Sequence, residues 1–425
     1  MEESFLHFIW KFQYFNKRPL ESDSGHEIVI FNAGFQNSNA GPDCMNAKIK
    51  IDEITWNGNV EIHVNAKDWY RHNHDRDTAC ENVVLHVVWK NDTSVLRKDN
   101  TAIPTLELKN IIDENLILNY NKLFVPGHEI LCKNFLESRN PIKIFNMMDK
   151  ALTQRLEKKA EYILRLIALT NGDWEEIAWQ LLCKNFGFKA NAYPFSELTK
   201  SLPFKILKKE SDQATTIEAL LFGQAGFLEK EIDDPYFNVL KKEYLFKQKK
   251  YKLERRLDEH QWKFLRLRPA NFPTIRIAQL SNLIANHKNL FSFFTNYSTT
   301  AQIKKDLKAV QSDYWKSHYH FDKKSNTKIG LLGKSSVDNI LINTVAPLVF
   351  TYGIHKNEED LKEKAMELLT EVKPEANSII NKWKDLGVEV KSAFDSQALI
   401  ELYNEYCLRK RCLNCSIVVD IESGN

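Results

Sequence analysis

Apolar and polar residues alternate along most of the first 110 positions, a pattern that is typical of half-buried strands. A short amphipathic helix, SFLHFIWKFQYF, precedes the strands, and sixteen residues separate the third strand from the fourth. That spacing suits a short helix with a loop and exceeds a tight hairpin. The predicted order is therefore α-β-β-β-α-β, with strands in the stretches HEIVIFNAG, NAKIKID, NVEIHVN and NVVLHVVW.

The hydrophobic period changes to three and four residues from about position 140, as in NMMDKALTQRLEKKAEYILRLIALT. This period predicts amphipathic helices, and most of the remaining chain continues it. We therefore expect an α+β domain with a mixed sheet over residues 1–135. A mainly α-helical domain, ending in a cysteine cluster, is expected over residues 136–425.

Composition supports this two-domain organisation and narrows the class of protein. The chain has 425 residues, 43% of them hydrophobic and 27% charged, and a net charge of +3. Single cores stop growing near roughly 250–300 residues, so two cores are expected, while the small net charge excludes a uniformly basic nucleic-acid-binding chain. The acidic start, the absence of a long apolar run and the seven scattered cysteines favour a soluble cytoplasmic protein without a membrane partner.

The strongest candidate chemistry lies in AGPDCMNAKIKIDEITWNGNVEIHV, which contains Pro42, Asp43, Glu61 and His63. Side chains alternate across a strand, so Glu61 and His63 point to the same face. Two carboxylates and an imidazole are suitable ligands for Mg²⁺ or Mn²⁺. A bound cation would activate water and stabilise charge on a phosphoryl oxygen.

These residues resemble the PD-(D/E)xK nuclease superfamily, whose core also runs α-β-β-β-α-β. Pro42 and Asp43 match its Pro-Asp element, and Glu61 matches the acidic position on the next strand. His63 stands where the superfamily usually places a lysine, and a histidine there would bind metal or orient water. The resemblance implies Asp43, Glu61 and His63 as catalytic residues, whereas the plainer interpretation makes Asp43 a turn cap and the other two a wet sheet face.

Three further histidines follow closely, at His72, His74 and His86. On a helix, His72 and His74 would diverge by about 200° and could not face one metal ion; on an extended segment they could. His74 is included among the expected metal ligands. His86 lies in the apolar run VVLHVVW, which favours a core histidine that bonds to a neighbour.

Longer strings resemble a bacterial family of uncharacterised proteins, domain of unknown function 2851. The match rests on GPDCMNAKI, GNVEIHV, DWYRHNHDRD, FGFKAN, IEALLFGQAGFL and WKFLRLRPANFPTIRIAQL, and it covers nearly the whole chain. The family implies no particular chemistry, so the nuclease hypothesis depends on the residues above.

Basic residues gather in KKEYLFKQKKYKLERR and in the following WKFLRLRPANFPTIR. They suggest phosphate contacts through Lys249, Lys250, Arg255, Arg266 and Arg268, against the plainer interpretation of a solvated helix.

Near the end of the chain, Cys407, Cys412 and Cys415 have the spacing C-x4-C-x2-C. Three thiolates in this spacing suit zinc or part of an iron–sulfur cluster, although a fourth ligand would have to come from elsewhere. Buried cysteines without a metal are the alternative.

Taken together, the sequence predicts a metal-dependent nuclease or phosphodiesterase acting on nucleic acid. Two alternatives stand beside it: a non-catalytic nucleic-acid or protein interaction module with a degenerate nuclease-like core, and an imidazole-rich metalloenzyme with another substrate.

Overall fold

The chain folds into two compact units in a computed structural model. Unit 1 comprises residues 1–134 together with 410–425, and unit 2 comprises residues 135–409. The residues described are 2–16, 19–37, 41–112, 117, 129–133, 136, 141–254, 257–409, 411–412 and 415–419.

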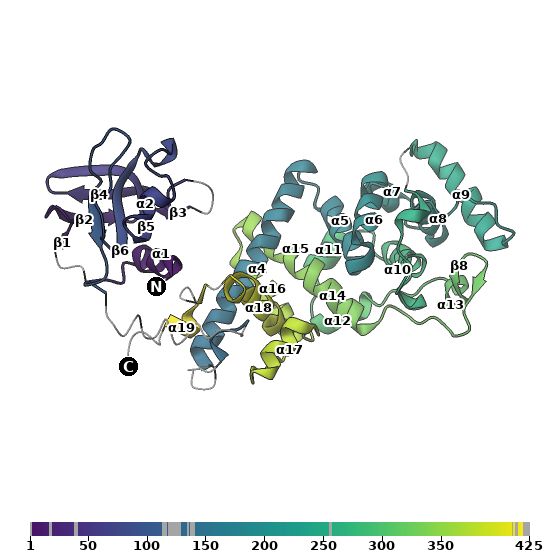
Figure 1. The fold of residues 1–425 in the computed structure, drawn as a ribbon. Coiled ribbons are helices and arrows are strands. Elements are labelled where there is room, and N and C mark those ends of the chain that lie inside the picture. Colours follow the sequence, from purple (N-terminus) through teal and green to yellow (C-terminus); the bar gives the residue numbers. More distant parts are fainter. Residues whose placement is uncertain are drawn as a thin grey trace. The chain divides into compact units, whose positions relative to one another are not determined.

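Unit 1 is built on a mixed sheet, as expected from the alternating pattern (Figure 1). The sheet order is β1-β2-β4-β5-β6-β7, with β3 paired to β4; β2, β4 and β5 are antiparallel, and β5, β6 and β7 are parallel. Its elements are α1 (Glu3–Phe12), β1 (Leu20–Glu21), β2 (Glu27–Asn32), β3 (Phe35–Gln36), β4 (Cys44–Ile51), β5 (Ile54–Asn65), α2 (Asp68–Arg71), η1 (Thr78–Cys80), β6 (Val83–Lys90) and β7 (Thr105–Glu107), with α19 (Ser416–Val419) near the end of the chain. The predicted order is thus found as α1-β2-β4-β5-α2-β6, with three additional short strands.

The buried strands β5 and β6 form the centre of this sheet. Every residue of 83–88 is buried, as expected for a parallel strand that is covered on both faces. The parallel register pairs Glu61 with His86 and His63 with Val88. Residues paired in register share a face, so Glu61, His63 and His86 project from the same side of the sheet.

Helix α1 packs against β5 through a buried apolar stripe that contains Phe5, Leu6, Ile9 and Trp10. The spacing of these residues is that of one helix face. The indole N–H of Trp10 donates to the carbonyl of Ala33 at 2.9 Å, which fixes the helix against the chain that leads into β3. The polar residues on the adjacent side of α1 are thereby held near the sheet.

Unit 2 is mainly helical, which confirms the expected fold class. Its elements are α4 (Pro141–Leu169), α5 (Trp174–Phe186), α6 (Phe188–Ser201), α7 (Phe204–Lys209), α8 (Ala214–Gln224), α9 (Pro235–Tyr251), η3 (Glu259–Gln261), η4 (Pro269–Asn271), α10 (Pro273–Asn286), α11 (Leu290–Thr295), α12 (Thr300–Asp306), α13 (Asp313–Ser317), β8 (His318–His320), β9 (Lys323–Lys324), α14 (Lys334–Ile340), η5 (Leu341–Val345), α15 (Ala346–Lys356), α16 (Glu359–Glu371), α17 (Ser378–Asp385), α18 (Ala393–Leu402) and η6 (Tyr403–Cys407).

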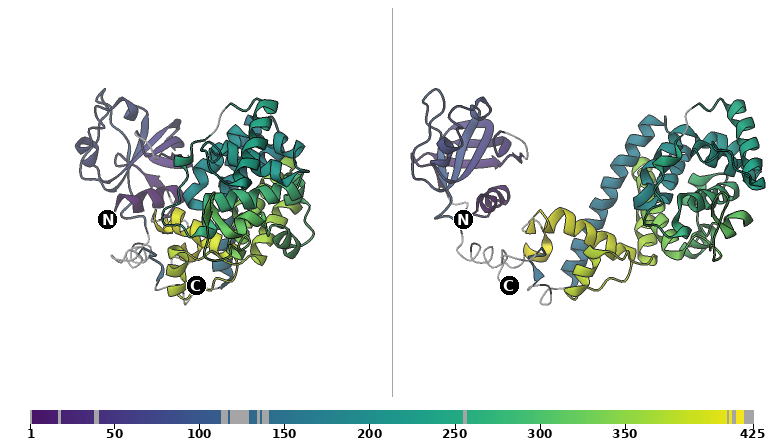
Figure 2. Two further views of the ribbon diagram at one scale, coloured as in Figure 1. Left: turned by 90° about the vertical axis from the view of Figure 1, so that its right-hand side faces the viewer. Right: turned by 45° about the vertical axis from the view of Figure 1, so that its right-hand side comes forward.

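The long helix α4 organises one end of unit 2, where it packs against α15 and α18 (Figure 2). Its buried residues, among them Met147, Leu152, Leu156 and Ile163, recur at helical spacing and form the stripe that contacts those helices. The span Lys334–Lys356 is long and apolar enough to cross a membrane, but 72% of its most apolar window is buried inside the protein, as in a core helix.

Candidate metal centre

Asp43 and Glu61 are brought together by two hydrogen bonds between neighbouring strands. Asp43 lies just before β4, and its carboxylate accepts from the backbone N–H of Ile62 at 3.0 Å. In return, the backbone N–H of Asp43 donates to the Glu61 carboxylate at 3.3 Å. The structure therefore places the two predicted acidic residues side by side, although they are eighteen positions apart in the sequence.

Glu61 also contacts His74, which arrives from the turn after α2. The carboxylate of Glu61 lies 3.1 Å from His74 Nε2, and the thiol of Cys80 lies 3.3 Å from His74 Nδ1. These hydrogen bonds, to Cys80 and then to Glu61, raise the pKa of His74 to about 10. His74 is therefore an imidazolium at neutral pH in the metal-free protein.

The short length of α2 decides where His72 and His74 point. The helix ends at Arg71, and Asn73 adopts a left-handed conformation with φ of 61°. The chain turns back there, because asparagine tolerates this conformation better than most residues. Both histidines consequently face His63, brought there by a turn and not by the helix or the extended segment that the sequence left open.

His63 lies at the buried end of this cluster and is bonded on both ring nitrogens. Its Nδ1 lies 2.9 Å from His86 Nε2, and its Nε2 lies 3.1 Å from His72 Nδ1. Burial lowers the pKa of His63 and of His86 to about 3, with the charge of His86 acting second on His63, so both rings are neutral at pH 7. His86 is thus the buried, hydrogen-bonded core histidine that its apolar surroundings predicted.

The proton positions in this chain of imidazoles follow from its buried end. Within the described part of the chain, His86 Nδ1 is buried and has no hydrogen-bond partner. A buried donor without an acceptor is costly, so the His86 proton belongs on Nε2, from which it donates to His63 Nδ1. The His63 proton then sits on Nε2 and faces His72. In this arrangement His63 is a positioning donor, and it becomes a metal ligand only if the protons shift toward His86.

Glu3 and His7 of α1 complete the cluster and were missed by the sequence reasoning. His7 Nε2 lies 3.8 Å from the Glu3 carboxylate and 3.6 Å from that of Asp43. Burial alone would lower the pKa of His7, but the nearby carboxylate of Glu3 and then the charge of Asp43 raise it. Their i, i+4 spacing places both side chains on one helix face, and this was the available signal.

Asp43 carries the main electrostatic cost of the cluster. Burial, followed by the negative charge of Glu61, raises the pKa of Asp43 to about 6, despite the opposing effects of His7 and the Ile62 N–H. Ionised Asp43 is therefore disfavoured at neutral pH, since the charge of His7 and the Ile62 N–H do not offset burial and the neighbouring Glu61. A bound cation would relieve this repulsion, because opposite charge favours the ionised form.

The residues of the cluster differ in their exposure to solvent. Glu61 and His63 are buried, Asp43 and His74 are partly buried, and His72 is exposed. The described part of the chain contains three groups of residues whose potential ligand atoms lie within 4.8 Å of one another inside each group. They are His63 with His72 and His74; His74 with Asp77 and Cys80; and Glu3 with His7 and Asp43. Each group contains at least one imidazole, and such sets suit Mn²⁺, Zn²⁺ or Fe²⁺ better than Mg²⁺, which prefers oxygen.

The three predicted cysteine ligands do not all belong to the same unit. Cys407 belongs to unit 2 and is partly buried, whereas Cys412 and Cys415 belong to unit 1 and are buried. The backbone N–H of Cys415 donates to the carbonyl of Cys412 at 3.0 Å. Zinc or iron–sulfur binding at these cysteines stays a prediction.

The predicted phosphate-contacting residues differ in their surroundings. Lys249, Arg266 and Arg268 are exposed in unit 2. Lys250 instead forms an ion pair with Glu210 at 2.8 Å, which ties its ammonium group to the protein. Arg255 lies outside the described residues.

The fold and this cluster define a class: a two-unit protein whose mixed-sheet unit holds a group of imidazoles and carboxylates in contact. The chain belongs to the family described as Protein of unknown function (DUF2851), whose model matches residues 3–378. The expected family is therefore confirmed. No curated protein and no solved structure matches the chain, and the resemblance to PD-(D/E)xK nucleases stays a prediction.

Proposed function

We propose that unit 1 is a divalent-cation-dependent phosphodiesterase that acts on nucleic acid. The observation that carries the proposal is the pairing of Asp43 with Glu61 through reciprocal hydrogen bonds across β4 and β5. Two adjoining carboxylates, one with a raised pKa, form an arrangement that a cation would stabilise. A bound cation would supply an activated water and stabilise charge on a phosphoryl oxygen.

The residues around the pair have distinct roles in this proposal. Asp43 and Glu61 hold the cation, and His63 orients water as a neutral hydrogen-bonding group. His74 becomes a third ligand when it gives up its proton, so cation affinity should rise with pH. In the metal-free state the His74 imidazolium contributes positive charge in the region where the nuclease superfamily keeps a lysine.

Exposed basic residues of unit 2 support the choice of nucleic acid as substrate. Lys249, Arg266 and Arg268 are accessible for phosphate contacts, and such contacts lose affinity steeply as salt is raised. Lys250 contributes less, because Glu210 already neutralises it.

The test combines cation binding with cleavage. Mn²⁺, Mg²⁺ and Zn²⁺ are titrated by calorimetry into the wild type, Asp43→Asn and Glu61→Gln, with Asp52→Asn as control because Asp52 is an exposed carboxylate on the turn that joins β4 and β5. The same proteins are incubated with single- and double-stranded DNA and RNA. We expect the first two variants to lose cation binding and cleavage by at least about 100-fold, more than the 10–100-fold that outer-shell changes usually cost. The control should keep both.

Three results would distinguish the phosphodiesterase proposal from its alternatives. Cation binding and cleavage that persist in Glu61→Gln would refute the proposal. Nucleic-acid binding without cation affinity or cleavage would favour the non-catalytic interaction module. Elemental analysis of wild type, Glu61→Ala and Cys412→Ala separates a metal at the carboxylates from one at the terminal cysteines.

A second function is favoured by the approach of His63, His72 and His74. Three imidazoles suit zinc or iron, and His63 would then donate Nδ1–H to His86, an outer-shell bond common for metal-bound histidine. Zinc or iron that survives purification, and is lost in His63→Asn and His74→Asn but retained in Asp43→Asn, would identify an imidazole-centred metalloenzyme.

A further inference from the structure

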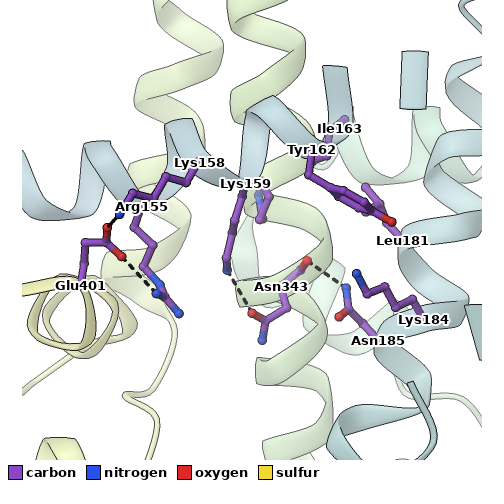
Figure 3. Close-up of a pocket in the computed structure, with 11 residues that line it drawn as sticks. Arg155, Lys158, Lys159, Tyr162, Ile163, Leu181, Lys184, Asn185, Asn343 and Glu401 are labelled. Carbon is purple, nitrogen blue, oxygen red and sulfur yellow. Dashed lines mark hydrogen bonds and ion pairs between the residues drawn. The ribbon is translucent and has the colours of Figure 1, made fainter. Parts of the chain in front are cut away.

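Two cavities of similar volume open within unit 2, and they differ in how their charges are compensated. The first, of about 370 Å³, is lined by four basic residues and by Glu401 (Figure 3). Glu401 lies within ion-pairing distance of Arg155 and Lys158, and Lys159 donates to the side chain of Asn343 at 3.0 Å. Much of the positive charge in the first cavity therefore already has partners within the protein.

The second cavity, of about 380 Å³, contains an arginine without a carboxylate. Its lining residues are Phe186, Gly187, Phe188, Lys189, Ala190, Asn191, Phe195, Leu267, Asn271, Arg276, Ser335, Ser336 and Asn339. This set includes two cations and no acidic residue. Arg276 is only 5% exposed, and a buried charge without a counter-charge is costly.

Among the described residues, the hydrogen-bond partners of the Arg276 guanidinium are all neutral. It donates to Gln279 at 3.1 Å, to Asn271 at 2.6 Å and to Ser336 at 3.1 Å. Arginine has five N–H donors, so two are left over, and Nε is buried without a partner in the described part of the chain. Burial lowers the pKa of Arg276 to about 10, so the group stays charged at neutral pH.

The local backbone positions an aromatic ring beneath this charge. Phe188 has φ of 48°, in the left-handed region that a bulky residue rarely adopts. Its ring lies 4.6 Å from the Arg276 guanidinium carbon, a cation–π contact that orients the guanidinium plane. Strained residues of this kind concentrate at binding sites.

We propose that this cavity binds a phosphate monoester carried on a small organic body, with Arg276 as the main anchor. Lys189 is exposed at the rim and forms no ion pair within the described residues, so it supplies a second positive charge. The two cations match the charge of a monoester, about −1.5 to −2, better than that of a carboxylate. Phe186, Phe195 and Leu267 provide an apolar wall for the organic part, and the volume falls in the usual range of small-ligand pockets.

The experiment titrates the full chain with adenosine monophosphate, inorganic phosphate and adenosine by calorimetry, in the presence of a chelator so that unit 1 holds no metal. We expect the monophosphate to bind and adenosine not to bind. If inorganic phosphate binds as tightly as the monophosphate, the natural ligand is the free ion; if it binds more weakly, the organic body contributes.

Variants assign the binding to this cavity. Arg276→Gln should weaken binding by about 100-fold or more and Lys189→Gln by about 10-fold, as expected for lost charge-assisted hydrogen bonds. Lys305→Gln, which changes an exposed lysine of α12 that is not among the residues lining the cavity, is the control and should not change the affinity. If Arg276→Gln does not fold, the exposed Lys189 variant decides the question. Absence of binding to the wild type, equal binding of adenosine, or unchanged affinity in Lys189→Gln would each overturn the proposal and leave Arg276 as a structural cross-link.

Discussion

The raised pKa of Asp43 predicts that this residue destabilises the metal-free protein. The pKa of its carboxyl rises from 3.8 to about 6, and a difference of one in pKa corresponds to about 1.4 kcal/mol. The ionised side chain therefore costs about 3 kcal/mol at neutral pH. Asp43→Asn should remove this cost, because an amide oxygen can still accept from the Ile62 N–H.

The sign of the pH dependence follows from linkage. A carboxyl whose pKa is higher in the folded state binds more protons when folded, so its cost is absent below pH 3.8. The cost grows between pH 3.8 and about 6 and is constant above that. The stabilisation by Asp43→Asn should appear over the same window.

Hydrogen exchange of peptides that cover β5, measured by mass spectrometry, reports this free energy in the full chain. At pH 7.5 without metal, exchange in Asp43→Asn should be about 100-fold slower than in the wild type, which corresponds to about 3 kcal/mol. Saturating Mn²⁺ should slow exchange in the wild type and have much less effect on the variant. Asp52→Asn is the control and should give no stabilisation, since bonds from the Glu27 N–H and His26 lower the pKa of Asp52. Equal or faster exchange in Asp43→Asn across pH 4–8 would refute the electrostatic reasoning.

Three further predictions follow from the structure. The pKa values of His63 and His86 are lowered to about 3 in the folded protein, so the stability that depends on their neutral forms is lost as the pH falls below the unfolded pKa of histidine. Acidification from pH 7 to 5 should therefore lower the free energy of unfolding, measured with urea, by about 2 kcal/mol per residue. This loss should be smaller in His86→Phe. Gly58→Ala should destabilise unit 1 by at least about 1–3 kcal/mol, since the new Cβ would lie 2.4 Å from Val84 Cγ1, and unchanged exchange in β5 would contradict this. Glu210→Gln should destabilise unit 2 by about 3 kcal/mol, because the ammonium groups of Lys247 and Lys250 lose their counter-charge. An unchanged melting temperature would show that these ion pairs do not stabilise unit 2.

The alternation of apolar residues predicted the sheet of unit 1 well, and helical periodicity predicted the character of unit 2. The short strands β1, β3 and β7 were missed, because two or three residues carry no measurable period. Asp43, Glu61, His63 and His74 were chosen by residue type and spacing, and the structure brings them together. Glu3 and His7 were not predicted, because the sequence of α1 does not indicate which segment its polar side contacts.

By itself the sequence determined which residues point to a common face, since the strand period of two places Glu61 beside His63 without knowledge of any partner. It also determined that two cores form. Only the tertiary structure decided that α2 ends at Arg71, which turns His72 and His74 toward His63, and that α1 adds two more groups. Only packing could bury Arg276 in a cavity whose lining residues include no carboxylate. The physical reason is that periodicity is local, whereas pKa values and burial depend on which distant segments meet.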